Sequence, residues 1–280
     1  MLKQRVLTTC ALALLLVALL YSSELWVWPM FVLVTGVMAS EEWAALHWSS
    51  WKIKVSYAVV SGMIAALIIL LPEIHSVTLV PIFIISAIFW MVLVPIWLVR
   101  QWIFQSNILH ALTGWLVIVP TMLAVNELKT QGVAVLIVSM AVIWISDVSA
   151  YFVGKAIGRR LLAPSISPGK TWEGVLGAII GVVCFGFVLR EVSIFDTQLA
   201  LVIHVAGWYW FPALMLLALL GVEGDLFESW LKRCAGVKDS GWVLPGHGGV
   251  LDRIDALTAA LPVAAGLMVW AAVGEKYNVF

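Results

Sequence analysis

Charged residues are scarce in this sequence. They make up 11% of its 280 residues, whereas apolar residues make up 63% and the mean hydropathy is +1.05. Soluble globular domains carry about a quarter charged residues, so this composition excludes a water-soluble fold.

The sequence also lacks an excess of either charge and has few cysteines. Sixteen Lys and Arg balance sixteen Asp and Glu, and no lysine-rich arm is present, so nothing in the charge indicates a nucleic-acid partner. Cys10, Cys184 and Cys234 are far apart and have no CxxC or metal-ligand spacing. We interpret them as structural or incidental, so we expect neither a disulfide framework nor a cysteine metal site.

Long apolar runs recur along the whole chain, and each can cross a hydrocarbon core of about 30 Å as a helix. We therefore predict an all-α, polytopic membrane protein with about nine transmembrane helices. The predicted spans cover residues 6–21, 25–40, 55–71, 79–99, 108–126, 132–153, 173–190, 199–222 and 256–274. The first of them begins like a signal peptide, but no small-x-small cleavage site follows, so we expect a transmembrane helix there.

The chain has no internal repeat and no low-complexity linker, so we expect residues 1–280 to form one integral membrane domain. Within it we distinguish an N-terminal helix pair (1–54), middle spans (55–153) and a C-terminal catalytic region (154–280).

Basic residues near the span ends predict the orientation, because Lys and Arg collect on the cytoplasmic side. With the N-terminus in the cytoplasm, only Lys129, Arg190 and Lys276 lie outside. The other basic residues then lie inside: Lys3, Arg5, Lys52, Lys54, Arg100, Lys155, Arg159, Arg160, Lys170, Lys232, Arg233, Lys238 and Arg253. Two polar segments, 154–172 and 223–255, therefore face the cytoplasm, and the connections near 72–77, 127–132 and 191–198 face outside.

The densest polar stretch covers residues 221–257. If the helix continues past Gly224, then Asp225, Glu228, Ser229 and Lys232 lie on one face, at spacings of three, four and seven residues. Carboxylates near a membrane boundary are costly unless they pair or bind a cation.

Asp252 and Asp255 are three residues apart at the start of the last predicted helix, where either could also cap it. Together with Asp225 they suggest a magnesium site whose remaining positions are open to phosphate oxygens.

A glycine-rich loop, KDSGWVLPGHGGVLDR, runs between these carboxylates. Gly246, Gly248 and Gly249 permit close backbone approach around His247, and exposed amides in such a loop can bind phosphate. Cationic groups that could hold a triphosphate lie in or beside it: Lys232, Arg233, Lys238 and Arg253.

The second polar segment, 153–174, contains SISPGKTWEG. Ser167, Lys170 and Thr171 precede a predicted helix whose first turn holds Glu173. A helix N-terminus with hydroxyls and a lysine can bind an anion, although the spacing is not that of a P-loop. For Arg159 and Arg160 we favour a topology or lipid head-group role.

Asp147 lies in an otherwise apolar span, near its cytoplasmic end. Ionisable residues within spans are functional by default, so Asp147 is a candidate for metal or substrate contact. An ion path through a transporter is an alternative, but the charge is concentrated on one side with no matching polar residues on the other.

Residues 229–255, SWLKRCAGVKDSGWVLPGHGGVLDRID, resemble the signature of the phosphatidate cytidylyltransferase (CDP-diglyceride synthetase) family, bacterial type, at every defining position. The segments SDVSAYFVGK and SISPGKTWEG are similar to other motifs of the family, and Val148 stands where a small or hydroxyl residue is expected.

The resemblance implies condensation of CTP with phosphatidate to CDP-diacylglycerol and pyrophosphate, by a multi-pass enzyme of the bacterial inner membrane with a cytoplasm-facing polar cavity. It implies Mg2+ as cofactor, with K+ as a second cation left open, and membrane lipids as surroundings. A homodimer is left open. The nearest rival activity is that of a CTP-dependent lipid kinase, which would transfer the gamma phosphoryl group and release CDP from a similar charged site.

Site residues follow from the motifs and the resemblance together. The catalytic set is Asp225, Lys232, Arg233, Lys238, Asp239, His247, Asp252 and Asp255. The substrate-binding set is Asp147, Ser167, Lys170, Thr171, Glu173, Ser229, Gly248, Gly249 and Arg253. The metal ligands are Asp225, Asp252 and Asp255.

Overall fold

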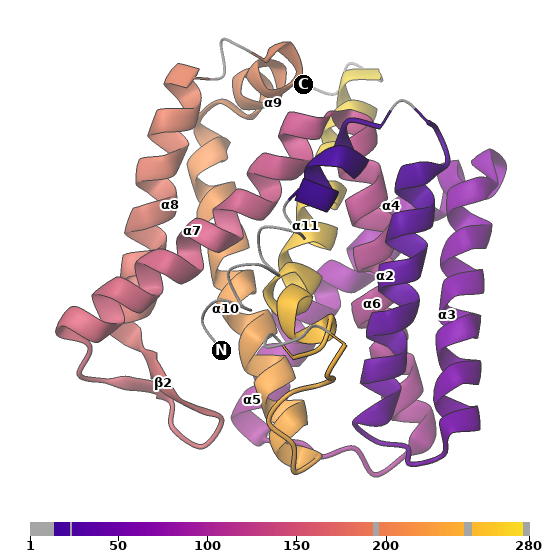
Figure 1. Cartoon of the computed structure of the whole chain (residues 1–280). Helices are drawn as coiled ribbons and strands as arrows, with labels where there is room; N and C mark the ends of the chain where they lie inside the picture. The colour runs from indigo at the N-terminus through magenta and orange to yellow at the C-terminus, as the bar shows by residue number, and fades with distance from the viewer. Residues whose placement is uncertain (1–13, 23, 193–195, 244–247, 277–280) are drawn as a thin grey trace.

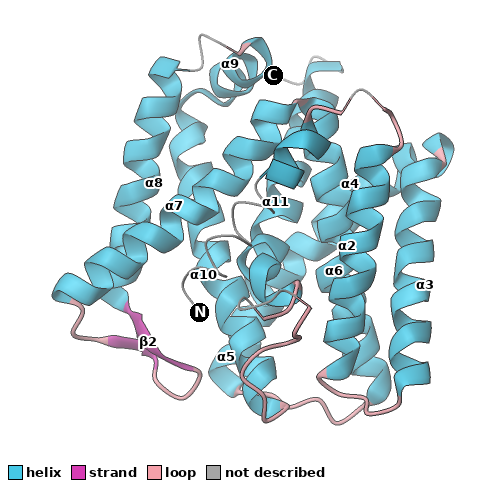
Figure 2. Ribbon diagram, in the orientation of Figure 1, coloured by secondary structure: helices cyan, strands magenta, loops and turns pink. Residues whose placement is uncertain are grey.

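A bundle of long helices makes up most of the molecule (Figures 1 and 2). The structure is a computed structural model that describes residues 14–22, 24–192, 196–243 and 248–276. The first predicted span, 6–21, lies partly outside these ranges, and residues 14–20 of it are helical.

The remaining predicted spans all fall on helices. The helices are α2 (Val27–Ala45), α3 (Trp51–Leu70), α4 (Pro72–Ile88), α5 (Val94–Arg100), α6 (Asn107–Gln131), α7 (Val133–Ile157), α8 (Trp172–Val192), α9 (Thr197–Ala206), α10 (Trp210–Cys234) and α11 (Leu251–Lys276). Several extend further than predicted. The connection expected at 72–77 is the start of α4, and most of the one expected at 127–132 is the end of α6, so helical structure extends into both connections.

Six segments of the described chain are long and apolar enough to cross a membrane. They are Trp51–Leu70, Val77–Arg100, Asn107–Gln131, Val133–Ile157, Trp172–Glu191 and Gln198–Cys234. The fold is therefore a predominantly helical membrane protein, and the finer prediction of nine spans stays a prediction.

Two predicted spans are interrupted. Residues 199–222 divide into α9 and α10 at a 3-10 turn, Gly207–Tyr209, where Gly207 has a positive φ of 54°. Glycine adopts this conformation at little steric cost. Residues 79–99 pass from α4 through a π-helical turn, Phe89–Leu93, into α5.

The prediction of a purely α-helical fold missed one β-hairpin. Strands β1 (Leu161–Ala163) and β2 (Ser167–Thr171) pair antiparallel between α7 and α8, at the lower left of Figure 2. Ile166 in its turn is 3% exposed and packs in a small cluster with Val175, Val222 and Leu226. Burial of this side chain attaches the hairpin to α8 and α10.

Helix α11 lies in the middle of the bundle and packs against α10, α6, α4, α7 and α2 (Figure 1). Its inner face is built of small and aliphatic residues, including Ala259, Leu261 and Ala265, each fully buried. Small residues let helix backbones approach closely in a membrane. The central position of α11 fixes where the carboxylates in its first turns lie.

Candidate functional site

The polar residues of α10 lie on one face, as predicted. The helix continues unbroken through Gly224 to Cys234, and it packs against α7, α8 and α11 and contacts the hairpin. Gly224 permits this packing, since a Cβ there would clash with the backbone oxygen of Asp255 on α11. The acidic residues of the two helices are thereby brought close together.

Lys232 bridges two buried carboxylates. Its Nζ donates to Glu228 Oε2 at 2.5 Å, one turn earlier on α10, and to Asp252 Oδ1 at 2.6 Å on α11. The side chains of Lys232, Glu228 and Asp252 are only 13%, 4% and 4% exposed. Removing one member of such a buried pair leaves an uncompensated charge, which costs about 3–5 kcal/mol.

Asp252 also organises the glycine-rich loop. Its Oδ2 accepts hydrogen bonds from the backbone N–H groups of Ser240 at 2.9 Å and Gly249 at 2.8 Å. Burial alone would raise the pKa of Asp252, but the hydrogen bond from Lys232 and those from the two amides hold it below its usual range. Asp252 is therefore an ionised carboxylate with protein donors on both oxygens.

A second ion pair joins the hairpin to α10. Lys170 Nζ lies 2.5 Å from Asp225 Oδ2 and donates to the backbone oxygen of Val222 at 3.2 Å. The Ser229 hydroxyl donates to Asp225 Oδ1 at 3.3 Å. The Lys170 and Asp225 side chains are 22% and 33% exposed, so this pair is more open than the Lys232 cluster.

Asp147 and Asp255 complete an acidic group around Asp225. Asp147 on α7 interacts electrostatically with both Lys170 and Asp225, and Asp255 on α11 is repelled by Asp225. Predicted site residues from α7, β2, α10 and α11 thus converge on one region.

Hard oxygen donors of this kind suit Mg2+. Asp225 and Asp255 repel each other, and the buried Glu228 Oε1 has no hydrogen-bond partner in the described structure. A cation would relieve both. Among the described residues, however, no group of three or more His, Cys, Asp or Glu side chains is already arranged around a metal position.

Other predicted substrate contacts have local structural roles. Thr171 Oγ1 accepts from the Gly174 amide in the first turn of α8. Glu173 Oε2 accepts from the amides of Arg159 at 3.1 Å and Arg160 at 3.2 Å, which closes the base of the hairpin. Ser167 is half-buried at the start of β2.

Four predicted residues make no polar side-chain contact with this cluster. Arg233, Lys238, Asp239 and Arg253 are exposed, and their side chains make no hydrogen bond or ion pair with other described residues. His247 lies outside the described residues. Gly248 has a positive φ of 82°, and a Cβ there would lie 2.7 Å from Asp252 Oδ2, so its backbone needs glycine.

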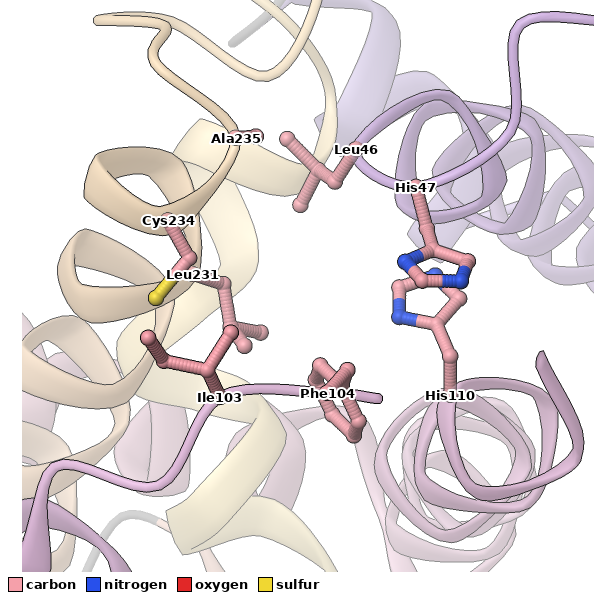
Figure 3. A pocket seen from close by; sticks show the side chains of 8 residues that line it. All are labelled: Leu46, His47, Ile103, Phe104, His110, Leu231, Cys234 and Ala235. Atoms are coloured by element: carbon pink, nitrogen blue, oxygen red, sulfur yellow. The ribbon is translucent and has the colours of Figure 1, made fainter. Parts of the chain in front are cut away.

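The structure also contains a small pocket that holds none of the predicted site residues (Figure 3). It is lined by Leu46, His47, Ile103, Phe104, His110, Leu231, Cys234 and Ala235. The two histidine rings stack with centroids 4.6 Å apart, and each has a fixed partner. His47 Nε2 bonds Asn107 Oδ1, and His110 Nε2 bonds the backbone oxygen of Trp43.

Sequence reasoning missed a buried carboxylate beside the site, Glu42 on α2. It is 2% exposed and accepts backbone hydrogen bonds from Val250 and Leu251 beside the site. Glu228 was placed on the correct face of α10 but not assigned to the site. One signal could have indicated Glu42: it is a carboxylate at the end of an apolar run, with no Lys or Arg next to it in sequence.

The fold and the geometry define a class of protein. It is a helical membrane protein in which acidic and basic residues converge on one site at the ends of α7, α10 and α11. Residues 3–271 match the sequence model of the cytidylyltransferase family. The chain belongs to that family.

Curated relatives agree with this assignment. A phosphatidate cytidylyltransferase of Pseudomonas aeruginosa is 36% identical over 97% of this chain and 98% of its own. Proteins of the same name from Haemophilus influenzae and Brucella abortus are 37% and 43% identical, over 56% and 46% of this chain and 56% and 44% of theirs.

Proposed function

We propose that this protein is a CTP:phosphatidate cytidylyltransferase, which forms CDP-diacylglycerol and pyrophosphate in phospholipid biosynthesis. The observation that carries this proposal is the match to a phosphatidate cytidylyltransferase along 97% of the chain, which includes the whole site. The convergence of lysines and carboxylates on one membrane-embedded region supports it.

The reaction needs no strong general base, because the phosphate monoester of phosphatidate is largely ionised at pH 7. A phosphatidate oxygen attacks the alpha phosphorus of CTP, the bond from that phosphorus to the bridging oxygen breaks, and pyrophosphate leaves with the electron pair. The protein must hold two anions in line and neutralise their repulsion.

Specific residues suit these tasks. Lys170, at the edge of the hairpin, and Lys232, buried on α10, supply fixed positive charge at the site. The exposed Arg233, Lys238 and Arg253 lie near the same helix ends and are available to contact phosphate oxygens.

Magnesium is part of the proposal. Asp225 and Asp255 would hold it, with Asp252 beside them. When bound, the cation would offset phosphate charge. Because Asp252 already accepts three hydrogen bonds from the protein, its main task in the described geometry is to orient Lys232 and the loop.

We also propose an inner-membrane location with the site on the cytoplasmic side. The ends of α5, α7 and α10 and the starts of α3 and α8 lie toward the lower end of Figure 1, together with most basic residues. Lys129 and Arg190 lie at the opposite helix ends. Such asymmetry fits the positive-inside rule.

The test uses purified protein in detergent with phosphatidate, Mg2+ and CTP labelled at the alpha or the gamma phosphorus. The proposal predicts alpha label in the lipid and gamma label in pyrophosphate. Gamma label in the lipid with release of CDP would instead establish a lipid kinase, and absence of any transfer would refute an enzymatic role on these substrates.

A further inference from the structure

Two neighbouring glutamates at the end of α2 have opposite environments. The Glu41 side chain is 39% exposed and its carboxylate pairs with Lys54 at 3.3 Å. Glu42, the next residue, is 2% exposed. A buried carboxylate is costly unless it receives hydrogen bonds, so the partners of Glu42 show what its burial achieves.

Glu42 receives three hydrogen bonds from the chain around the start of α11. Oε1 accepts from the Val250 amide at 2.9 Å, and Oε2 accepts from the Leu251 amide at 2.7 Å and the Ser240 hydroxyl at 3.3 Å. These donors are 198 to 209 residues away in sequence. A carboxylate is also favourable at a helix N-terminus, where backbone N–H groups lack helical partners.

The backbone is shaped around this carboxylate. A Cβ at Gly241 would clash with Glu42 Oε1, and a Cβ at Gly249 would clash with Glu42 Oε2. Both glycines belong to the loop that joins α10 to α11: Gly241 lies in its first half and Gly249 lies just before α11. Their lack of side chains lets the two arms of the loop approach the end of α2.

The same backbone segments are held from the other side by Asp252. Its Oδ2 accepts from the Ser240 and Gly249 amides, and its Oδ1 accepts from Lys232. Ser240 and the backbone of residues 249–251 are therefore fixed between two carboxylates, one from α2 and one from α11. Displacement of this backbone would move Asp252 and, through it, the Lys232 ammonium.

We propose that Glu42 is a positioning residue of the active site. It holds Ser240 and residues 249–251, which lie between α10 and the start of α11, in the geometry that orients Asp252 and Lys232 and presents the Gly248–Gly249 backbone to the phosphates of CTP. This inference rests on the proposed function. It assigns to α2, in the N-terminal part of the chain, a direct share in building a site whose other residues come from α7 to α11.

The test compares Glu42→Gln with Glu41→Gln in steady-state kinetics. Glutamine keeps the size of the side chain but replaces one acceptor oxygen with a donor, so one of the Val250 and Leu251 amides loses its partner. We expect the KM for CTP to rise at least tenfold in Glu42→Gln, with the KM for phosphatidate within twofold of wild type. Glu41→Gln should keep both values within twofold.

A merely structural role gives a different pattern. Loss of folded protein would lower the maximal rate in proportion and leave the KM for CTP unchanged, and that result would overturn the inference. Ser240→Ala removes only the longest of the three hydrogen bonds and is the milder variant if Glu42→Gln is poorly folded. It should raise the KM for CTP about two- to fivefold, and an unchanged KM would count against the inference.

Equilibrium binding of CTP separates this inference from the proposed function. If wild-type protein binds CTP but transfers no cytidylyl group, the proposed function fails while the inference is still tested. At least tenfold weaker CTP binding by Glu42→Gln than by Glu41→Gln supports it, and equal binding contradicts it.

Discussion

Replacement of Lys232 by methionine gives the sharpest test of the buried charge cluster. Methionine has a similar length but no charge, so Glu228 and Asp252, each 4% exposed, lose their shared cation. Breaking such a buried pair costs about 3–5 kcal/mol. By the scaling for domains of this size, the Tm in detergent should fall by roughly 10 °C.

Lys170→Met is the matched control, because Lys170 also pairs with an aspartate of α10 but in a more open setting. Its side chain and that of Asp225 are 22% and 33% exposed, so loss of this pair should cost about 1 kcal/mol or less. The assay is thermal unfolding of both variants in the same detergent. Equal Tm values for the two variants would refute the account of a buried cluster.

A double variant, Lys232→Met with Glu228→Gln, separates stability from chemistry. Removal of the Glu228 charge relieves much of the uncompensated charge, so most of the lost stability should return. Activity should stay at least a hundredfold below wild type, since the ammonium that we place at the phosphates is still missing. Recovery of activity together with stability would show that Lys232 is only structural.

Three further predictions address the loop, the cation and the orientation. Gly249→Ala should lower both Tm and activity, because its Cβ would clash with Glu42. Gly169→Ala is the control, because no atom lies within 4 Å of its added Cβ. Its Tm should stay within about 2 °C of wild type, on the scale of about 2–4 °C per kcal/mol. Removal of divalent cations by EDTA should abolish cytidylyl transfer, and added Mg2+ should restore it. The Asp255→Asn variant should require at least tenfold more Mg2+ for its half-maximal rate. An unchanged Mg2+ requirement would exclude Asp255 as a ligand. With Cys234 as the sole cysteine, a membrane-impermeant maleimide should label inverted inner-membrane vesicles and not spheroplasts, and the reverse pattern would overturn the cytoplasmic orientation.

Helical periodicity accounts for the part of the site that the sequence could predict. A helix that continues past Gly224 necessarily places Asp225, Glu228, Ser229 and Lys232 on one face, and α10 does so. Two ion pairs join residues that are far apart in sequence: Lys170 with Asp225, and Lys232 with Asp252. All four residues lie in the two charged polar segments that are visible in the sequence. Their pairing is set by how α8, α10 and α11 pack, which periodicity does not encode.

Tertiary packing also explains what was missed. The hairpin depends on burial of Ile166 against α8 and α10, and a three-residue strand has no periodic signal of its own. In the local sequence Glu42 resembles its neighbour Glu41. The two differ because Ser240, Val250 and Leu251, distant in sequence, donate hydrogen bonds to Glu42. The break at Gly207 follows from a single positive φ in an apolar run that otherwise continues.

Direct attack by the lipid phosphate on the alpha phosphorus of CTP is the central claim, and oxygen-isotope tracing tests it most directly. Phosphatidate carrying oxygen-18 in the non-bridging oxygens of its phosphate would be turned over with unlabelled CTP, and both products analysed by mass spectrometry. The account predicts CDP-diacylglycerol that retains the full label and pyrophosphate that contains none. Loss of label from the lipid, or its appearance in pyrophosphate, would contradict it.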